Sequence, residues 1–453
     1  MIILKQKHKD LFKELVKAYY NDNFEEKVKE LIDKEEVSKE KLSKEIAILC
    51  GVYVDFNESY EKYIEELKDA IKNYESKHKI VTKIGDHCGC IESGKEPQCQ
   101  KSCPFDAILL NKESGSTYID SEACVDCGIC VEACENGNIL DKVQFMPLLE
   151  LLKSGDIVIA EVAPAITNQF NDASLDQMRT ALKKIGFSDM IEVAFFADML
   201  TLKEAAEFNA NVKSEDDFMI TSCCCPMWVG MLKKVYSDLV KHVSPSVSPM
   251  VAGGRVIKKL NPNAKVVFIG PCVAKKAEAK EKDLIGDIDY VLTFTELEEI
   301  FNALNIEPSK LEPTPTLQYA SKGGRLYART GGVSKAITEC IEGVYPDKIG
   351  KVKVVKGDGV KDCKELLNKA LKGEITGNFI EGMGCKGGCV GGPKALLDVE
   401  TGTEKVNKCA DESEFINGSE SEKMNSILAM LGINELKDFL NEDKTNIFHR
   451  NFK

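Results

Sequence analysis

The sequence predicts an α/β domain of two lobes, with mostly parallel sheets flanked by helices, together with a small α+β domain and a helical N-terminal region. Three observations support this fold class. Apolar runs alternate with amphipathic stretches after residue 146, eight cysteines gather between residues 81 and 140, and the first 80 residues carry apolar side chains at helical spacing. We expect the parts at residues 1–80, 81–145 and 146–453, the last with peripheral C-terminal helices.

The composition limits the class of protein. A chain of 453 residues, 43% of them hydrophobic, can bury a reactive site in more than one domain. The net charge of -13 is spread over mixed-sign segments, which argues against nucleic acid as a partner. No apolar run has the length of a bilayer-spanning helix and the first residues do not have the pattern of a signal peptide, so we expect no membrane partner and a cytoplasmic location.

The N-terminal region is expected to be helical, with charged faces exposed to solvent. The apolar residues that carry this pattern are Leu11, Leu15, Tyr19, Tyr63, Leu67 and Ile71.

The α/β domain is predicted from short apolar runs. The expected strands are residues 157–162, 191–195, 218–221, 265–269, 290–293, 352–355 and 378–380. Thr295 and Glu298 have the spacing of a capping box and predict the start of a helix. Strands that alternate with helices favour parallel sheets, whose ligands bind beyond the carboxyl ends of the strands.

Cysteine usage points to metal binding. The chain has 18 cysteines, which a cytoplasmic protein of this length does not need as disulfides, and only five histidines. Thiolate-rich iron-sulfur chemistry is therefore favoured over zinc or copper sites built on imidazole. Four cysteines stand isolated and are expected to pack as small apolar side chains: Cys50, Cys340, Cys363 and Cys409.

The small domain carries a doubled cysteine pattern. Cys124, Cys127, Cys130 and Cys134 have the C-x2-C-x2-C-x3-C spacing of bacterial ferredoxins. Upstream, a variant C-x-C-x8-C-x3-C pattern precedes Pro104 and is formed by Cys88, Cys90, Cys99 and Cys103. Structural zinc in one half is the alternative, but the spacing favours a ferredoxin-like domain with two 4Fe-4S clusters.

The crossover rule of two-cluster ferredoxins assigns the ligands, because the last cysteine of each run belongs to the other cluster. One cluster would then be held by Cys88, Cys90, Cys99 and Cys134, and the other by Cys103, Cys124, Cys127 and Cys130. Two such clusters in series form an electron relay, which requires a redox partner at its far end.

Three further segments carry cysteines, and each follows a predicted strand. They are Thr221-Ser222-Cys223-Cys224-Cys225-Pro226-Met227-Trp228, Gly270-Pro271-Cys272-Val273-Ala274-Lys275-Lys276 and Glu381-Gly382-Met383-Gly384-Cys385-Lys386-Gly387-Gly388-Cys389-Val390-Gly391-Gly392-Pro393. With these segments in this order, residues 81 to about 400 resemble the FeFe-hydrogenase family. Three cysteines in the first segment, and Gly270 where the family usually has a methionine near the di-iron unit, resemble a divergent clostridial-type branch.

The resemblance implies an H-cluster, in which a 4Fe-4S cube is joined to a di-iron unit with CO, cyanide and an azadithiolate bridge. The cube ligands carry over to Cys225, Cys272, Cys385 and Cys389, with Cys389 as the bridge to the di-iron unit. Cys224 becomes the thiol that passes protons, Lys275 the residue that bonds a cyanide, and Met383 one that packs against the di-iron unit. Ala163 and Pro164, and the segment Thr330-Gly331-Gly332, resemble further lining of the pocket, although each could be ordinary loop structure.

The resemblance also implies a proton route. The family pattern leads from Cys224 through Glu204 and Ser244 to Glu207. Glu204 and Glu207 lie three residues apart and share one face of a predicted helix, which by spacing alone is more typical of a solvated helix face.

The expected activity is the interconversion of H2 with protons and electrons. The expected partners are a small ferredoxin or similar one-electron carrier and the maturation proteins that install the di-iron unit. Two other functions remain open, a hydrogen or redox sensor with slow turnover and an iron-sulfur assembly factor that lacks the di-iron unit. An assembly factor predicts loss of the proton thiol or of the cyanide-binding lysine, whereas Cys224 and Lys275 are present.

Overall fold

The computed structural model describes residues 2–35, 38–56, 59–75, 79–85, 96–111, 115–221, 224–316 and 319–452. Cys88, Cys90 and Cys223 lie outside the described residues. Two compact units make up the chain: Met1–Asp156 with Cys272–Lys280 and Tyr290–Glu307, and Ile157–Pro271 with Glu281–Asp289 and Pro308–Lys453. In the described ranges no helix combines the length and the apolar character that crossing a membrane requires.

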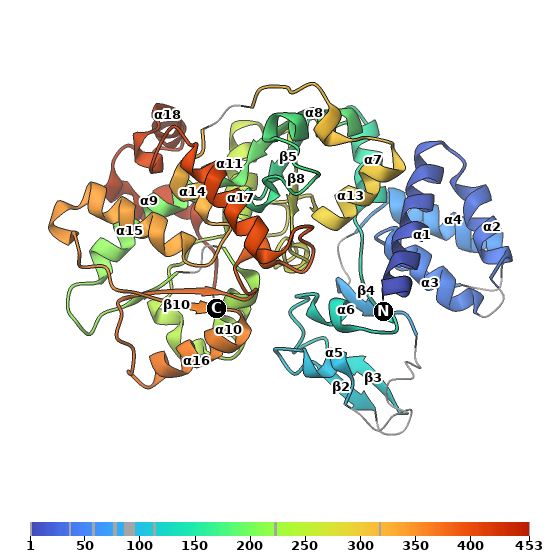
Figure 1. Cartoon of the computed structure of the whole chain (residues 1–453), viewed down its shortest axis with the longest axis horizontal. Coiled ribbons are helices and arrows are strands. Elements are labelled where there is room, and N and C mark those ends of the chain that lie inside the picture. The colour runs from blue at the N-terminus through green and yellow to red at the C-terminus, as the bar shows by residue number, and fades with distance from the viewer. Residues whose placement is uncertain are drawn as a thin grey trace. The chain divides into compact units, whose positions relative to one another are not determined.

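The first unit begins with helices, as predicted for the N-terminal region (Figure 1). They are α1 (Ile2–Tyr20), α2 (Phe24–Asp33), α3 (Lys39–Leu49) and α4 (Tyr60–Lys72). The side chains of Leu15, Tyr63, Leu67 and Ile71 are almost fully buried, which confirms the helical periodicity read from the sequence. Ser38 caps α3 by accepting a hydrogen bond from the backbone N of Lys41 at 3.2 Å.

The cysteine-rich part of the first unit has two small antiparallel sheets. β1 (Val81–Lys83) pairs with β4 (Ile139–Asp141), and β2 (Ile108–Asn111) pairs with β3 (Ser116–Ile119). The remaining elements of this unit are α5 (Gln98–Lys101), α6 (Ile129–Ala133), α7 (Phe145–Lys153), α12 (Ala274–Glu278), β9 (Tyr290–Thr293) and α13 (Phe294–Ala303).

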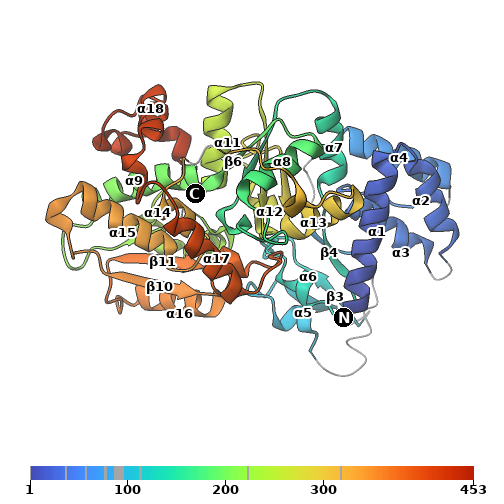
Figure 2. The same ribbon diagram turned by 45° about the horizontal axis from the view of Figure 1, so that its top comes forward.

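The second unit contains two parallel sheets with helices around them (Figure 2), which confirms the prediction of an α/β part with parallel sheets. In one sheet β5 (Val158–Val162) lies between β6 (Asp189–Glu192) and β8 (Lys265–Gly270). In the other, β11 (Phe379–Met383) lies between β10 (Val354–Asp358) and β7 (Met219–Ile220).

Helices of the second unit complete its core. The longer ones are α8 (Leu175–Ile185), α9 (Val193–Asn211), α10 (Pro226–Lys234), α11 (Pro249–Leu260), α15 (Gly332–Val344), α16 (Val360–Leu371), α17 (Val399–Asp411) and α18 (Glu422–Met430). Short ones are α14 (Lys322–Leu326), α19 (Glu442–Thr445) and the 3-10 turns η1 (Pro164–Ile166), η2 (Ser237–His242), η3 (Pro308–Lys310), η4 (Pro346–Lys348), η5 (Cys389–Gly391), η6 (Gly418–Glu420), η7 (Leu436–Leu440) and η8 (Asn446–Phe448). The central helix is α9, which packs against α11, α14 and α15.

Two local predictions were wrong. The strand expected at residues 191–195 ends at Glu192, and Val193 begins α9. Because α9 is buried on nearly all sides, its apolar residues show no periodicity that separates a buried helix from a buried strand.

The second wrong prediction concerns the capping box of α13, which is formed by Thr293 and Glu296 rather than by Thr295 and Glu298. Two overlapping Thr-x-x-Glu frames occur here, and the earlier one matches the point where β9 ends.

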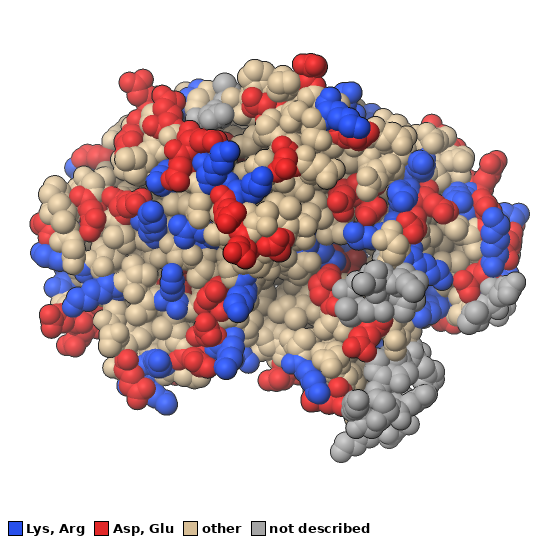
Figure 3. Space-filling model, in the orientation of Figure 1, with Lys and Arg blue, Asp and Glu red and all other residues tan. Residues whose placement is uncertain are grey.

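Charged side chains of both signs are scattered over one face of the molecule. Figure 3 shows Lys and Arg side chains interspersed with Asp and Glu side chains over the visible face. This distribution matches the mixed-sign segments of the sequence.

Candidate functional site

The first and third cysteine segments meet at one sheet edge of the second unit. β7 and β11 are parallel neighbours, and the backbone N of Thr221 donates to the carbonyl O of Ile380 at 3.0 Å just beyond β7. The ring of Trp228 occupies the space that a Cβ on Gly382 would need, so it packs directly against the third segment. Its Nε1 donates to the carbonyl O of Thr221 at 2.7 Å. Parallel strand order therefore brings together segments that are more than a hundred residues apart.

The thiols of the first segment face the third. The backbone N of Gly384 donates to Sγ of Cys225 at 3.3 Å, and Sγ of Cys224 lies 3.6 Å from Sδ of Met383. Met383 is almost fully buried, whereas both thiols are partly exposed. Cys225 occupies the N-cap of α10 with Pro226 following it, an arrangement that fixes the start of the helix.

The loop that carries Cys385 and Cys389 is held by close backbone contacts. Gly388 has φ +86°, and a Cβ there would lie 2.6 Å from the backbone N of Thr330. That same N donates to the carbonyl O of Gly387 at 3.1 Å. One carboxylate oxygen of Asp358 accepts from the Thr330 hydroxyl at 2.6 Å and from the Gly387 backbone N at 2.7 Å. Glycine is required here for both conformation and space.

The end of β8 touches the same loop. The carbonyl O of Pro271 accepts from the backbone N of Lys394 at 3.1 Å, and a Cβ on Gly392 would lie 2.7 Å from it. Pro271 is joined to Cys272 by one peptide bond. At the neighbouring strand end, Ala163 donates from its backbone N to the carbonyl O of Ile269 at 2.8 Å, and Pro164 begins η1.

Within the first unit, the residues after Cys272 pack on the cysteine-rich part. Val273 is fully buried in a cluster with Cys99, Cys130 and Cys134, and a Cβ on Gly128 would lie 2.8 Å from its side chain. Lys275 donates to a carboxylate oxygen of Glu278 at 2.6 Å, and both side chains are buried. A lysine ammonium has three protons to donate, so it can bond an anion as well as a carboxylate.

Six of the eight predicted cluster cysteines are described. Cys103, Cys124, Cys127 and Cys130 lie close enough for their charges to interact, and burial raises the pKa of Cys127 to about 12. Backbone N–H groups donate to three sulfurs: Ala107 to Cys103 at 3.3 Å, Asp126 to Cys124 at 3.3 Å and Asn138 to Cys134 at 3.2 Å.

These thiols suit an iron-sulfur cluster. A buried thiol needs a compensating positive charge to become a thiolate, which a metal supplies, and N–H donors stabilise thiolate sulfur. Among the described residues, no three Cys, His or carboxylate side chains close around a single ion.

Three of the four predicted proton-route residues lie along α9 and the loop before α11, while Cys224 comes just before α10. Ser244 donates to one carboxylate oxygen of Glu207 at 2.6 Å, and its Oγ lies 2.8 Å from Oγ of Ser246. Glu204 is fully buried one turn before Glu207. Sequence reasoning missed Lys203, which pairs with Glu207 and donates to Ser246 at 3.0 Å. The one hint in the sequence was that Lys203 is next to Glu204, because residue spacing does not show whether a lysine is buried.

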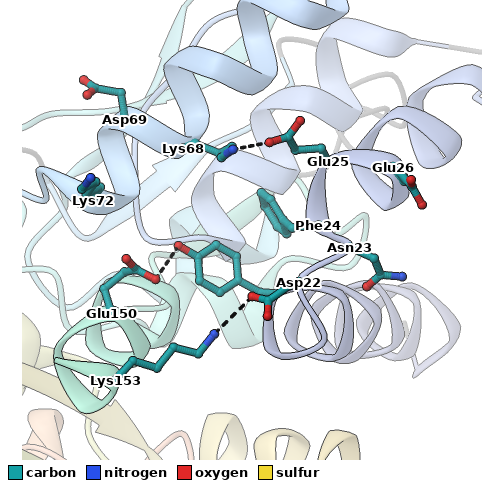
Figure 4. A pocket seen from close by; sticks show the side chains of 11 residues that line it. Asp22, Asn23, Phe24, Glu25, Glu26, Lys68, Asp69, Lys72, Glu150 and Lys153 are labelled. Atoms are coloured by element: carbon teal, nitrogen blue, oxygen red, sulfur yellow. Dashed lines mark hydrogen bonds and ion pairs between the residues drawn. The ribbon is translucent and has the colours of Figure 1, made fainter. Parts of the chain in front are cut away.

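A separate hollow lies in the first unit, with a volume of about 660 Å³. It is lined by residues of α1, α2, α4 and α7 (Figure 4). Two ion pairs lie in its lining: Lys68 with Glu25, and Lys153 with Asp22 at 3.6 Å. Tyr19 donates to Glu150 at 3.1 Å. The hollow contains none of the predicted site residues.

Comparison with known proteins identifies related families. The family described as iron only hydrogenase large subunit, C-terminal domain, matches residues 156–393, and a 4Fe-4S binding domain matches residues 117–140. Iron hydrogenase 1 of Clostridium pasteurianum is 26% identical over 297 residues, which cover 55% of this chain and 52% of that protein. The chain thus spans about half the length of that relative.

Two further curated relatives differ in their described roles. The periplasmic Fe hydrogenase large subunit of Nitratidesulfovibrio vulgaris is 30% identical, with 65% of this chain and 82% of that protein covered. Cytosolic iron-sulfur assembly component 3 of Bos taurus is 23% identical, with 62% and 72% covered.

A solved structure supports the fold. A variant of FeFe-hydrogenase HydA1 from Chlamydomonas reinhardtii aligns with a TM-score of 0.55 at 22% identity, covering 68% of this chain and 98% of that one.

Proposed function

The chain belongs to the iron-only hydrogenase family, and on that premise we propose that it is an FeFe-hydrogenase that interconverts H2 with protons and electrons. The observation that carries the proposal is the meeting of Cys224 and Cys225 with Met383 and Gly384 at one sheet edge. A proton-passing thiol beside a metal-ligating one is the combination that heterolytic chemistry of hydrogen requires.

The proposed ligands of the H-cluster cube are Cys225, Cys272, Cys385 and Cys389. Their donor chemistry fits, since none of the four is in a disulfide and the backbone N–H of Gly384 donates to the Cys225 sulfur. When bound, the H-cluster would supply the metal centre at which the H–H bond is made or broken. Met383 would pack against it, and Ala163 and Pro164 would line its pocket.

The remaining chemistry belongs to side chains of this protein. Cys224 would hold a proton at Sγ and exchange it with Glu204, after which Ser244 and Glu207 would carry it outward. Lys275 would place its ammonium against an anionic ligand of the metal, while Glu278 orients it from the other side.

Electrons would reach the site through two 4Fe-4S clusters. The proposed ligand sets remain those of the crossover pattern, with the ferredoxin-like domain at residues 81–145 and the catalytic domain at 146–453. Clusters of this type exchange single electrons, so a small ferredoxin or a similar carrier is the proposed partner, and maturation proteins would install the di-iron unit. The proposed compartment is the cytoplasm, where the thiols stay reduced.

The test is infrared spectroscopy of the matured protein together with H2 production from an artificial electron donor. We expect CO and cyanide bands and turnover, and loss of both in Cys389→Ala. The matched control is Cys340→Ala, which removes a buried cysteine of α15 that packs in the core. Iron bound as ordinary cubes without CO bands would contradict the proposal.

A second candidate is an iron-sulfur assembly factor, which the similarity to cytosolic iron-sulfur assembly component 3 favours. Such a protein would bind cubes and transfer them to an acceptor without a di-iron unit. Lys275 and Cys224 would then have no chemical role, so Cys224→Ser and Lys275→Gln would leave cluster transfer unchanged. In a hydrogenase the same two changes abolish turnover.

A further inference from the structure

Glu207 belongs to a closed ring of hydrogen bonds among buried side chains of the second unit. Lys203 pairs with one carboxylate oxygen of Glu207 and donates to Oγ of Ser246 at 3.0 Å. Ser246 lies 2.8 Å from Ser244, which donates to the other oxygen of Glu207 at 2.6 Å. All four side chains are buried, with exposed fractions from 0% to 7%. The two serine hydroxyls both donate and accept, so they can pass a proton on to the Glu207 carboxylate, whereas the Lys203 ammonium only donates.

The C-terminal segment runs antiparallel to the loop that carries the two serines. The backbone N of Val247 donates to the carbonyl O of Phe448 at 2.8 Å, and the N of Arg450 donates to the carbonyl O of Pro245 at 2.9 Å. Ser246 and His449 therefore lie directly opposite each other, as a non-hydrogen-bonded pair of an antiparallel bridge. Such pairs have the closest approach in an antiparallel ladder, with Cα atoms about 4.5 Å apart and both side chains on one face.

The imidazole of His449 thus lies on the same side as the hydroxyl of Ser246, and it is partly exposed to solvent. Its ring Nε2 lies 3.4 Å from Oγ1 of Thr445 in α19.

The charges around His449 come from four residues on three helices. Burial lowers the pKa of His449, Lys203 of α9 and Arg255 of α11 lower it further, and Glu207 of α9 and Glu442 of α19 raise it. Two of these charges, Lys203 and Glu207, belong to the ring itself. A proton that enters or leaves the ring therefore changes the proton affinity of the imidazole, which is the coupling that a relay needs.

We propose that His449 is the station at which this proton route exchanges protons with solvent. The inference rests on the proposed function and extends its route beyond Glu207. Lys203 is a positioning residue, because its bonds to Glu207 and Ser246 hold both side chains in place.

The proton balance is simple. For each proton moved inward, the imidazolium of His449 loses a proton to the ring, each serine hydroxyl accepts one proton and gives up another, and the Glu207 carboxylate becomes a carboxylic acid. The neutral imidazole then takes a proton from water or buffer. No electron moves in these steps, and the outward direction reverses them.

The test compares His449→Gln with His242→Gln in the holoenzyme. His242 is also partly exposed with a lowered pKa, but its charged neighbours are Lys241 and Asp217. We expect His449→Gln to lower kcat for H2 evolution at least about tenfold, to raise the solvent isotope effect and to regain rate with imidazole in the buffer. His242→Gln should show none of these changes. A merely structural role for His449 would produce no rescue by imidazole.

A second readout does not depend on turnover. Titration of His449 by NMR should give a lower pKa in Glu207→Gln than in the unaltered protein, because the Glu207 carboxylate raises it. An active enzyme whose His449→Gln variant keeps its rate and isotope effect would overturn the relay alone, as would an unchanged His449 pKa in Glu207→Gln. Absence of H2 chemistry in the unaltered, matured chain would overturn the proposed function and the relay together, even with the NMR coupling intact.

Discussion

The ammonium of Lys276 donates to the carboxylate of Asp141 at 2.9 Å, with the lysine side chain fully buried. It also donates to the carbonyl O of Lys142 at 2.6 Å and pairs with Glu296 of the α13 capping box. One side chain thereby joins the helix after Cys272 to the end of β4 and to the start of α13, all within the first unit.

Lys276→Met should destabilise the first unit strongly. The change leaves Asp141 and Glu296 buried without their cation, and removing one partner of a buried ion pair costs about 3–5 kcal/mol. Chemical denaturation followed by circular dichroism measures the loss. Lys335→Met is the control, because Lys335 and Glu339 form an exposed pair at 3.8 Å that contributes at most about 1 kcal/mol. Equal effects of the two variants would contradict the assignment.

Gly388→Ala should disturb the loop of Cys385 and Cys389. A Cβ there lies 2.6 Å from the backbone of Thr330, in a residue with φ +86°. Gly373→Ala separates the effect of the positive φ from that of the close contact, because Gly373 has φ +69° and nothing lies within 4 Å of the added Cβ. We expect the Gly388 variant to bind less iron per chain than the Gly373 variant, as measured by metal analysis. Similar iron contents would mean that the close contact is unimportant.

Asp198 should make stability depend on pH. Burial raises its pKa from 3.8 to about 7, although hydrogen bonds from Ser321 oppose the rise. Because the folded protein holds a proton that the unfolded chain has released, this contribution is full below about pH 3.8 and is lost as the pH rises to about 7. From pH 5 to pH 8 the unaltered protein should lose on the order of 2 kcal/mol relative to Asp198→Asn.

Unfolding free energies at the two pH values measure this difference. Asp217→Asn is the control, because Asp217 is exposed and backbone N–H groups of Ser214 and Lys213 lower its pKa. The Asp217 carboxylate makes its full contribution to the free energy of unfolding above about pH 4. The stability of Asp217→Asn should therefore change with pH from 5 to 8 in the same way as that of the unaltered protein. If Asp198→Asn lost more stability than the unaltered protein between pH 5 and pH 8, the direction assigned to the Asp198 pKa shift would be wrong.

Gly270→Met should be tolerated only together with a smaller neighbour. A Cβ at Gly270 would lie 2.5 Å from the ring of Phe268, so the single change is expected to cost about 1–3 kcal/mol through overpacking. Gly270→Met with Phe268→Leu should recover much of that stability in urea denaturation. If the double variant is as unstable as the single one, Phe268 is not the obstacle. Film voltammetry on the double variant then tests whether the methionine shifts the ratio of H2 evolution to uptake.

Much of the local structure could be predicted from sequence. β9 has the predicted bounds, and β5, β8 and β11 begin or end within three residues of the predicted strands. Cys50, Cys340 and Cys363 are buried, as expected for small apolar side chains, while Cys409 is partly exposed. The start of α9 was missed because a fully buried helix lacks the polar face that reveals its period.

Cysteine spacing was enough to predict iron-sulfur chemistry, since spacing within a few residues sets which thiols a short loop can present to a cluster. Which buried charges meet could be learned from the folded chain alone. Lys276 reaches Asp141, and His449 lies opposite Ser246, across gaps of well over a hundred residues. Such pairings depend on how whole elements pack, and no local pattern around either partner encodes the distance between them.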